Sequence, residues 1–259
     1  MVSRRSIVGT IAAALIATAI GIVLSYVIHW FPVQASTQAH HTDTLYHVLV
    51  IASVPIFVLV VTVILYSVWQ FRVKPGQELE DGPPIHGNTR LEVIWTAIPA
   101  MILLGLVSYS FVVLHENEKK PAGPEMVVNV TGQQFAWSYE YPSSATGGAP
   151  LKTTQLYVPD NESVHFEIKS LDVIHAFWIP AFRLQIDAVP GITTSYRATP
   201  DRLGSYPVVC NLLCGVGHGL MRSTVHVVTP SAFQAWLKSR ASASGGASTG
   251  QPGAPASAS

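Results

Sequence analysis

The two cysteines of the chain lie close together near its C-terminal end, at Cys210 and Cys214. His218 and Met221 follow them within a few residues. Thiolate, imidazole and thioether groups are ligands that copper selects, and a mononuclear blue-copper site combines one cysteine with two histidines and a weak axial methionine. A second thiolate makes it possible for two metals to share two sulfurs. A disulfide is the alternative in an exported domain, but it does not explain the positions of His218 and Met221.

A dinuclear centre needs one more strong ligand, for which four other histidines in the second half of the chain are candidates: His115, His165, His175 and His226. His115 lies where the last apolar segment ends. His165 and His226 lie in alternating strand patterns, where an exposed or hydrogen-bonded imidazole is usual. His175 lies at an apolar strand end that opens a long loop, and a buried histidine needs a compensating partner. The sequence leaves two interpretations of His175 open, a metal ligand or a hydrogen-bonded core residue.

Composition separates an apolar first part from a more polar second part. Of all residues, 49% are hydrophobic and 12% are charged, whereas a soluble domain has about 25% charged residues. Three apolar segments, Ile7–Trp30, Leu45–Phe71 and Leu91–Leu114, reach the roughly 20 residues that cross a bilayer. The formal net charge of zero argues against a nucleic-acid partner bound by phosphate neutralisation.

The first apolar segment is either a retained membrane helix or a cleaved signal. It exceeds the apolar core of about 7–15 residues that signal peptides have, which favours a retained helix. Val33-Gln34-Ala35 nevertheless resembles a cleavage site, and Arg4-Arg5 resembles part of a twin-arginine signal. Basic residues place the N-terminus and the loop Arg72–Arg90 on the cytoplasmic side. With three spans, the chain after about His115 lies on the outer face of the membrane.

Short segments rich in Val, Thr and aromatic residues predict an all-β domain after the membrane part. They are Met126–Thr131, Ala136–Tyr141, Lys152–Val158, Ser163–Ser170, Thr194–Ala198, Gly204–Val209 and Arg222–Val228. A short amphipathic helix, Ala232 to about Ser239, is expected to follow, and the small and polar residues 241–259 predict a disordered tail. The polar patch Ser36–Asp43, which contains His40 and His41, predicts an exposed loop.

These patterns divide the chain into four parts. We expect an N-terminal transmembrane helix or signal over residues 1–35, a transmembrane helix hairpin over 36–118, a β domain over 119–240 and the tail over 241–259.

Several spaced motifs resemble subunit II of the bacterial-type haem–copper cytochrome c oxidases. In the second half these motifs are Asp172-Val-Ile-His175-Ala-Phe-Trp-Ile-Pro180, Asp187-Ala-Val-Pro-Gly191 and Cys210-x3-Cys214-Gly-x2-His218-x2-Met221. The segment His86–Pro99 is similar to the start of a membrane helix of that family, and the aromatic segment Gly132–Tyr141 is similar as well. The resemblance extends from about residue 43 to residue 238.

The resemblance implies a cupredoxin-like β-barrel that carries CuA, a dinuclear copper centre. The implied ligands are five side chains and the backbone carbonyl of one leucine: His175, Cys210, Leu212, Cys214, His218 and Met221. The two thiolates would bridge the coppers, and each histidine would bind one copper. The methionine would be a weak axial ligand of one copper, and the leucine carbonyl would serve the other.

The resemblance also implies the function. Reduced cytochrome c, or another small donor, would give electrons one at a time to CuA. Haem in subunit I, which also carries CuB, would receive them, and oxygen would become water while protons are pumped. Subunit III and the lipid bilayer are further expected partners. This chain has no C-x-x-C-H haem attachment motif, so it does not reduce oxygen alone.

Three alternatives are a quinol-oxidase subunit II, which would lack the copper ligands, a membrane-anchored copper electron carrier, and a relative of nitrous-oxide reductase. The last should have a separate histidine-rich domain. The segment Glu92–Pro99 favours assembly with an oxidase core over a free carrier.

Two positions depart from the family pattern. Leu212 stands where the family usually has a glutamate that reaches a magnesium ion shared with subunit I, so no magnesium ligand is expected from Leu212. Phe135 stands where the family usually has the tryptophan at which electrons enter. Phe135 and Trp137 are therefore candidates for that role, with packing at the barrel edge as the alternative.

Four carboxylates are further candidates. The resemblance makes Glu92 the mouth of a proton path, although a carboxylate at a helix start is also stabilised by the helix dipole. Glu140, Asp172 and Asp187 could steer a basic cytochrome c by complementary charge, or they could be ordinary turn and strand-end residues.

Overall fold

A computed structural model describes residues 4–73, 75–76, 84 and 86–245 of the chain. It divides into two compact units. Met1–Trp30 and Thr42–His115 belong to the first unit, and Phe31–His41 and Glu116–Ser259 belong to the second.

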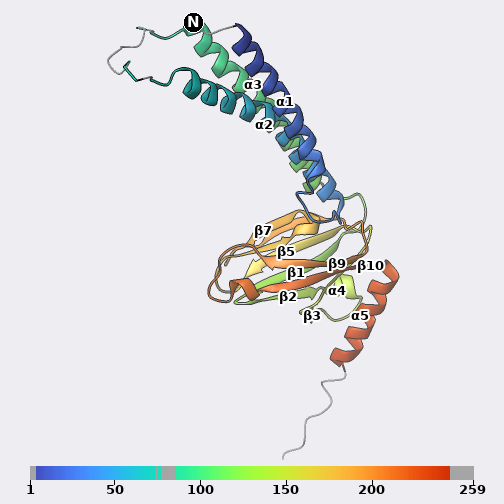
Figure 1. Ribbon diagram of the computed structural model, residues 1–259. Helices are drawn as coiled ribbons and strands as arrows, with labels where there is room; N and C mark the ends of the chain where they lie inside the picture. The colour runs from blue at the N-terminus through green and yellow to red at the C-terminus, as the bar shows by residue number, and fades with distance from the viewer. Residues whose placement is uncertain (1–3, 74, 77–83, 85, 246–259) are drawn as a thin grey trace, which may run out of the picture. The chain divides into compact units, whose positions relative to one another are not determined.

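Three long helices make up most of the first unit: α1 (Arg4–Val27), α2 (Thr37–Gln70) and α3 (Thr89–Glu118) (Figure 1). All three are long and apolar enough to cross a membrane, so the three predicted apolar segments are confirmed as helices. α1 and α2 pack closely, because a Cβ at Gly21 would lie 2.7 Å from a methyl carbon of Val54. Part of the predicted loop Arg72–Arg90 lies outside the described residues.

The second unit is a sandwich of two five-stranded sheets (Figure 1). The first sheet has the order β3-β2-β1-β5-β8, with β3 Leu151–Thr153, β2 Ala136–Tyr141, β1 Met126–Gln133, β5 Val164–Ser170 and β8 Thr194–Ala198. The second has the order β4-β10-β9-β6-β7, with β4 Leu156–Pro159, β10 Arg222–Val228, β9 Gly204–Cys210, β6 His175–Ile179 and β7 Leu184–Ala188. Each sheet contains one parallel pair, β1 with β5 and β4 with β10. This architecture confirms the prediction that a cupredoxin-like β domain follows the membrane helices in the chain.

Large aromatic side chains fill the space between the sheets. Tyr139, Phe166 and Phe177 are fully buried, and the ring of Phe177 lies edge-on to Trp137 at 5.2 Å between centroids. Alternation along β5 places Val164, Phe166 and Ile168 on the core side, as expected when successive side chains point to opposite faces. The core therefore extends to β6, where the candidate ligand His175 lies.

The predicted strands are confirmed with two corrections. The prediction of a single strand over Lys152–Val158 is wrong, because this stretch forms two strands, β3 and β4, that belong to different sheets. The long loop expected after His175 is also wrong. His175 begins strand β6, a single 3-10 turn η1 (Pro180–Phe182) follows, and β7 returns antiparallel to β6.

The polar patch Ser36–Asp43 is not a loop, although its two histidines are exposed as predicted. α2 begins at Thr37, and His40 Nε2 lies 3.2 Å from Asp201 Oδ2. The residues just before the helix are built into the β unit. Ala35 and Ser36 are fully buried, and the N–H of Ala35 donates to the carbonyl of Ala181 at 2.9 Å.

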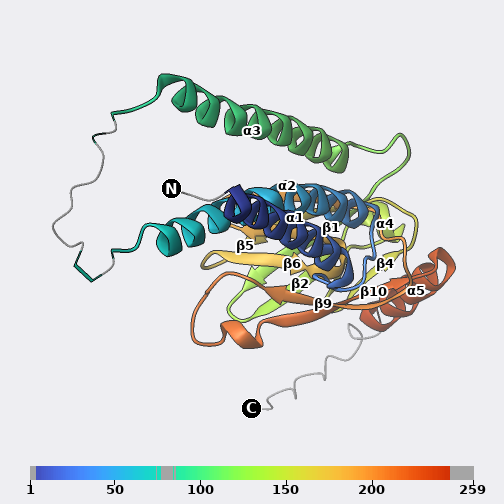
Figure 2. The ribbon, with the colours of Figure 1, turned by 45° about the horizontal axis from the view of Figure 1, so that its top comes forward.

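Two further helices belong to the β unit. α4 (Ser143–Thr146) is a single turn, and α5 (Pro230–Gly245) lies beside β10 and β4 (Figure 1 and Figure 2). Trp236 stacks on Tyr157 of β4 at 4.5 Å. The helix expected to end near Ser239 extends to Gly245, so the tail expected from residue 241 is helical over its first residues. Residues 246–259 lie outside the described residues.

Candidate metal centre

The loop between β9 and β10 carries both cysteines. Cys210 is the last residue of β9, and its N–H donates to the carbonyl of Met221 at 3.1 Å, which closes the base of the loop. Gly215 has a φ of 135°, a conformation that favours glycine. A 3-10 turn, η2 (His218–Leu220), then brings the chain back to β10. The ends of an antiparallel strand pair therefore hold a short ligand-bearing loop.

The soft donor atoms of this loop converge. Cys210 Sγ and Cys214 Sγ lie 3.8 Å apart, which is too far for a disulfide bond of about 2.05 Å, and both cysteines are free. Cys214 Sγ lies 3.7 Å from His218 Nδ1 and 3.9 Å from Met221 Sδ. Cys210 Sγ lies 3.3 Å from the carbonyl oxygen of Leu212. At these spacings the donor atoms lie close enough together to bind shared metal ions.

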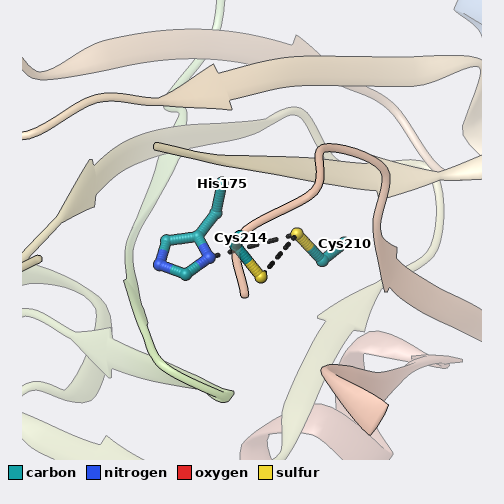
Figure 3. Close-up of side chains that lie close together, drawn as sticks. All are labelled: His175, Cys210 and Cys214. Atoms are coloured by element: carbon teal, nitrogen blue, oxygen red, sulfur yellow. Dashed lines mark hydrogen bonds between the residues drawn. The ribbon is translucent and has the colours of Figure 1, made fainter. Parts of the chain in front are cut away.

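His175 reaches the same place from β6. Its Nδ1 lies 4.0 Å from Cys210 Sγ (Figure 3), and one donor atom each from His175, Cys210 and Cys214 lie within 4.8 Å of one another. The pairing of β6 with β9 explains this meeting, because Phe177 lies opposite Cys210 in the register. Two sequence segments that are far apart therefore complete one donor set.

Asp172 orients the imidazole of His175. Its Oδ1 lies 2.8 Å from His175 Nε2, so a neutral imidazole that donates from Nε2 leaves the Nδ1 lone pair facing the thiols. Metal-ligating histidines usually donate their second ring N–H to such a partner. Burial raises the pKa of Asp172, but hydrogen bonds from Gln134 N–H, His175 and Val173 N–H outweigh it and lower the pKa to about 2. The carboxylate is therefore charged at neutral pH.

Gly132 of β1 makes room for this imidazole. A Cβ at position 132 would lie 3.1 Å from His175 Cδ2 and 2.9 Å from Trp137 Cζ3. Trp137 is buried and lies edge-on to His175 at 5.9 Å between centroids. The sequence interpretation did not single out Gly132, although it lies at the start of the aromatic segment that carries part of the resemblance.

Of the other candidate histidines, two lie elsewhere in the β unit with partners of their own. His165 Nδ1 lies 3.8 Å from the carboxylate of Glu125, and His226 Nδ1 lies 2.8 Å from Ser205 Oγ. His115 lies in α3. The structure thus brings His175 to the cysteines, as one of the two open interpretations expected, and its role as a ligand stays a prediction.

The candidate positions for electron entry both lie near the donor set. Phe135 lies in the turn between β1 and β2, and its ring packs on Gly217, where a Cβ would lie 2.4 Å from Phe135 Cδ2. Trp137 packs in the core between His175 and Phe177.

The four candidate carboxylates have different neighbours in the structure. Asp172 contacts His175, and Asp187 lies opposite Ala176 in the β6–β7 register. Glu140 pairs with Lys152 at 3.3 Å, which offsets its charge. Glu92 accepts a hydrogen bond from the N–H of Asn88 at 3.1 Å in the first turn of α3, so it stabilises that helix start. The roles in docking and in proton uptake stay predictions.

We expect the metal-free thiol of Cys214 to be protonated at neutral pH. Burial raises the pKa of Cys214 above its ordinary value, and the neighbouring Cys210 raises it further. Alkylation of Cys214 in the metal-free chain should therefore increase with pH through a midpoint above ~8.5, the value of a free cysteine. The stability that the chain gains from the neutral Cys214 thiol is fully present below the pKa of the thiol in the unfolded chain. It is lost as pH rises through the raised pKa of the folded chain. A midpoint at or below that of a free thiol, measured by mass spectrometry, would contradict this expectation.

Comparison with known proteins places these observations in a family. Residues 23–113 match the family model of the cytochrome C oxidase subunit II transmembrane domain, and residues 150–228 match that of its periplasmic domain. The chain is 31% identical over 278 residues to cytochrome c oxidase subunit 2 of Thermostichus vulcanus, covering 84% of this chain and 83% of the relative. This chain belongs to the cytochrome c oxidase subunit II family.

A second relative in sequence agrees with this membership. Cytochrome c oxidase subunit 2 of Cereibacter sphaeroides is 33% identical over 237 residues, which cover 78% of this chain and 76% of the relative. Among solved structures, the periplasmic domain of subunit II (CoxB) of Bradyrhizobium japonicum is 27% identical, with a TM-score of 0.44, over 49% of this chain and 98% of that domain.

Family membership gives the coarse function. The chain is a part of an oxidase complex, it is anchored in a membrane, and its β unit is the periplasmic domain of subunit II. Membership in a haem–copper oxidase implies partnership with subunit I. The His175–Cys210–Cys214 cluster in that domain points to copper as the metal.

Proposed function

We propose that this chain is the subunit through which electrons enter a proton-pumping terminal oxidase. The β unit would accept electrons one at a time from reduced cytochrome c and pass each one to haem in subunit I, where oxygen is reduced to water. The observation that supports this most directly is the pair of free thiols, whose sulfurs lie 3.8 Å apart. Each sulfur has a histidine Nδ1 beside it, that of His175 at 4.0 Å from Cys210 and that of His218 at 3.7 Å from Cys214.

The donor set fits a dinuclear copper centre, CuA. Its members would be the side chains and the one carbonyl that converge on the thiols: His175, Cys210, Leu212, Cys214, His218 and Met221. Such a centre, when bound, shares one electron between two metals. The protein residues hold the donors in place through the β9–β10 strand pair and through Asp172, so electron transfer would require little movement of the ligands.

Leu212 supports the proposed carbonyl ligand. Its carbonyl oxygen lies 3.3 Å from Cys210 Sγ, and its residue surface is 38% exposed. Every residue type supplies the same backbone carbonyl, so leucine at this position is compatible with copper binding. A leucine side chain has no oxygen, so we propose that magnesium receives no ligand from it.

The surface around the thiols suits contact with protein partners. Leu213, Val216 and Leu220 of the β9–β10 loop are each more than 80% exposed, and exposed apolar groups that lie together mark interaction sites. Membership in the family makes subunit I one partner. We propose a small electron-donor protein, cytochrome c in the first instance, as another.

The experiment that tests this proposal is electron paramagnetic resonance of the copper-loaded full chain in detergent. We expect hyperfine splitting from one electron shared equally by two coppers. Splitting from a single copper would contradict the dinuclear site. Purification from membranes without any haem-containing subunit would instead support a free copper carrier.

We propose that α1 stays in the mature chain, which would then cross the membrane three times with the β unit outside. Cleavage after Ala35 would place a charged amino group on Ser36, which is fully buried, and burying an unpaired charge is costly. It would also separate Ala35, which hydrogen-bonds to Ala181 and Asp201, from the rest of the chain. N-terminal sequencing of the purified protein should find residues from before Trp30, and a start near Ser36 would contradict retention.

A further inference from the structure

The turn between β1 and β2 touches the cysteine loop at two places. The ring of Phe135 fills the space beside Gly217 and Gly215, where a Cβ would approach it to 2.4 Å and 3.1 Å respectively. Next to it, the side chain of Gln134 donates from Nε2 to the carbonyl oxygen of Cys214 at 2.7 Å. Thus the loop that carries Cys214, His218 and Met221 is held from outside by residues that are not themselves donors to a metal.

Gln134 has a second bond, toward the other half of the donor set. Its backbone N–H donates to Asp172 Oδ2 at 2.7 Å. The other oxygen of the same carboxylate, Oδ1, is bonded to His175 Nε2 at 2.8 Å. A continuous series of hydrogen bonds therefore connects His175 through Asp172 and Gln134 to Cys214.

This series matters because its two ends, His175 and Cys214, come from different parts of the chain. Cys210 is fixed by the strand ladder, since its N–H bonds to the Met221 carbonyl and it lies opposite Phe177 in β6. Cys214 lies beyond the end of β9, inside the loop. The bond from Gln134 Nε2 thus joins the Cys214 peptide to the turn that follows β1.

We propose that Gln134 is a positioning residue for the copper centre, which sets the position of Cys214 relative to His175 through its bonds to Cys214 O and to Asp172. The proposal rests on the copper site of the proposed function. Partners of metal-ligating groups orient those groups, and their loss typically lowers metal affinity about 10–100-fold. We expect an effect in that range for loss of the Gln134 amide.

The chemistry of the amide gives a sharp substitution. Gln134→Glu keeps the length of the side chain and the backbone N–H to Asp172, but it replaces the Nε2 donor with an oxygen that faces the Cys214 carbonyl. Gln134→Ala removes the side chain without adding charge. Gln133→Ala is the matched control, because Gln133 is the adjacent glutamine at the exposed end of β1.

The first measurement uses the copper-loaded full chain in detergent. Copper loss to a chelator, followed by the thiolate–copper absorption, should be about 10-fold faster or more in Gln134→Glu and Gln134→Ala than in the Gln133→Ala control. The thermal midpoints of the metal-free variants should match that of the control. Loss rates equal to the control would overturn the proposal, and so would a fall in midpoint that accounts for the faster loss.

The second measurement needs no copper. In the metal-free chain, the ratio of Cys214 to Cys210 alkylation, resolved by mass spectrometry, should rise several-fold in both Gln134 variants, because the side chain that they lose is bonded to the Cys214 carbonyl. An unchanged ratio would overturn the proposal. If the wild-type chain binds no copper but the ratio rises, the proposed function fails while the positioning role of Gln134 stands for the metal-free loop.

Discussion

Full-length protein carrying Cys210→Ser should contain no dinuclear copper centre and should not accept electrons from reduced cytochrome c. Cys210 Sγ lies 3.8 Å from Cys214 Sγ in the same loop and 4.0 Å from His175 Nδ1 of β6. It therefore lies beside donors from both segments that form the site. A hydroxyl does not replace a thiolate as a soft ligand for copper, and a single remaining sulfur cannot provide two bridges. We expect the shared-electron resonance signal to disappear and the copper content to fall by at least half.

The matched control for this prediction is His226→Gln. His226 lies in β10, where its Nδ1 bonds to Ser205 Oγ at 2.8 Å and its ring stacks on Tyr157. It is a potential copper ligand by type but lies outside the donor cluster, so copper content and signal should equal those of the wild type. If Cys210→Ser keeps the shared-electron signal, the assignment of the bridging sulfurs is wrong.

The local part of the site could be predicted from the sequence. Cys210, Cys214, His218 and Met221 lie within one short loop, so their spacing alone indicates that their donors can meet. His175 is one of several candidate histidines, and its apolar neighbours in the sequence indicate only that its imidazole needs a partner. The structure places its Nδ1 beside Cys210, and the reason is the pairing of β6 with β9, which no local pattern contains.

Strand pairing was also the cause of the errors in the fold. β3 and β4 follow each other within one stretch of strand-forming residues, but β3 pairs with β2 and β4 pairs with β10. Alternation along a strand shows which residues face the core but not which strand lies alongside. β6 is absent from the predicted strands because its apolar sequence, His175–Ile179, lacks such alternation.

Backbone hydrogen bonds account for the other unforeseen features. Polar residues at Ser36–Asp43 predicted a loop, yet Ser36 is buried because its neighbours bond to the β unit, for example Thr37 N–H to the carbonyl of Thr199 at 3.1 Å. The link from Gln134 to Cys214 likewise ends on a carbonyl. The identity of the acceptor residue has little influence on such bonds, so the sequence carries little signal for them.

The largest effect on stability is expected for Phe177→Ala. Phe177 is fully buried in β6 and contacts the rings of Trp137, Tyr139 and Phe166 at 5.2, 6.5 and 5.9 Å between centroids. Truncating a buried phenylalanine to alanine removes its transfer free energy and leaves a cavity, with a typical cost of 3–5 kcal/mol. The free energy of unfolding of the β unit, measured by denaturant titration of tryptophan fluorescence, should fall by about 4 kcal/mol.

The effect should reach the metal centre because Phe177 lies opposite Cys210 in the strand register and two residues after His175. Phe177→Leu, which keeps most of the buried volume, should cost about 1–2 kcal/mol and retain copper. Leu213→Ala is the surface control: Leu213 lies in the cysteine loop but is 81% exposed, so its change should remain within about 0.5 kcal/mol. Equal decreases in the free energy of unfolding for Phe177→Ala and Leu213→Ala would show that the ring of Phe177 does not stabilise the strands that hold the donor set.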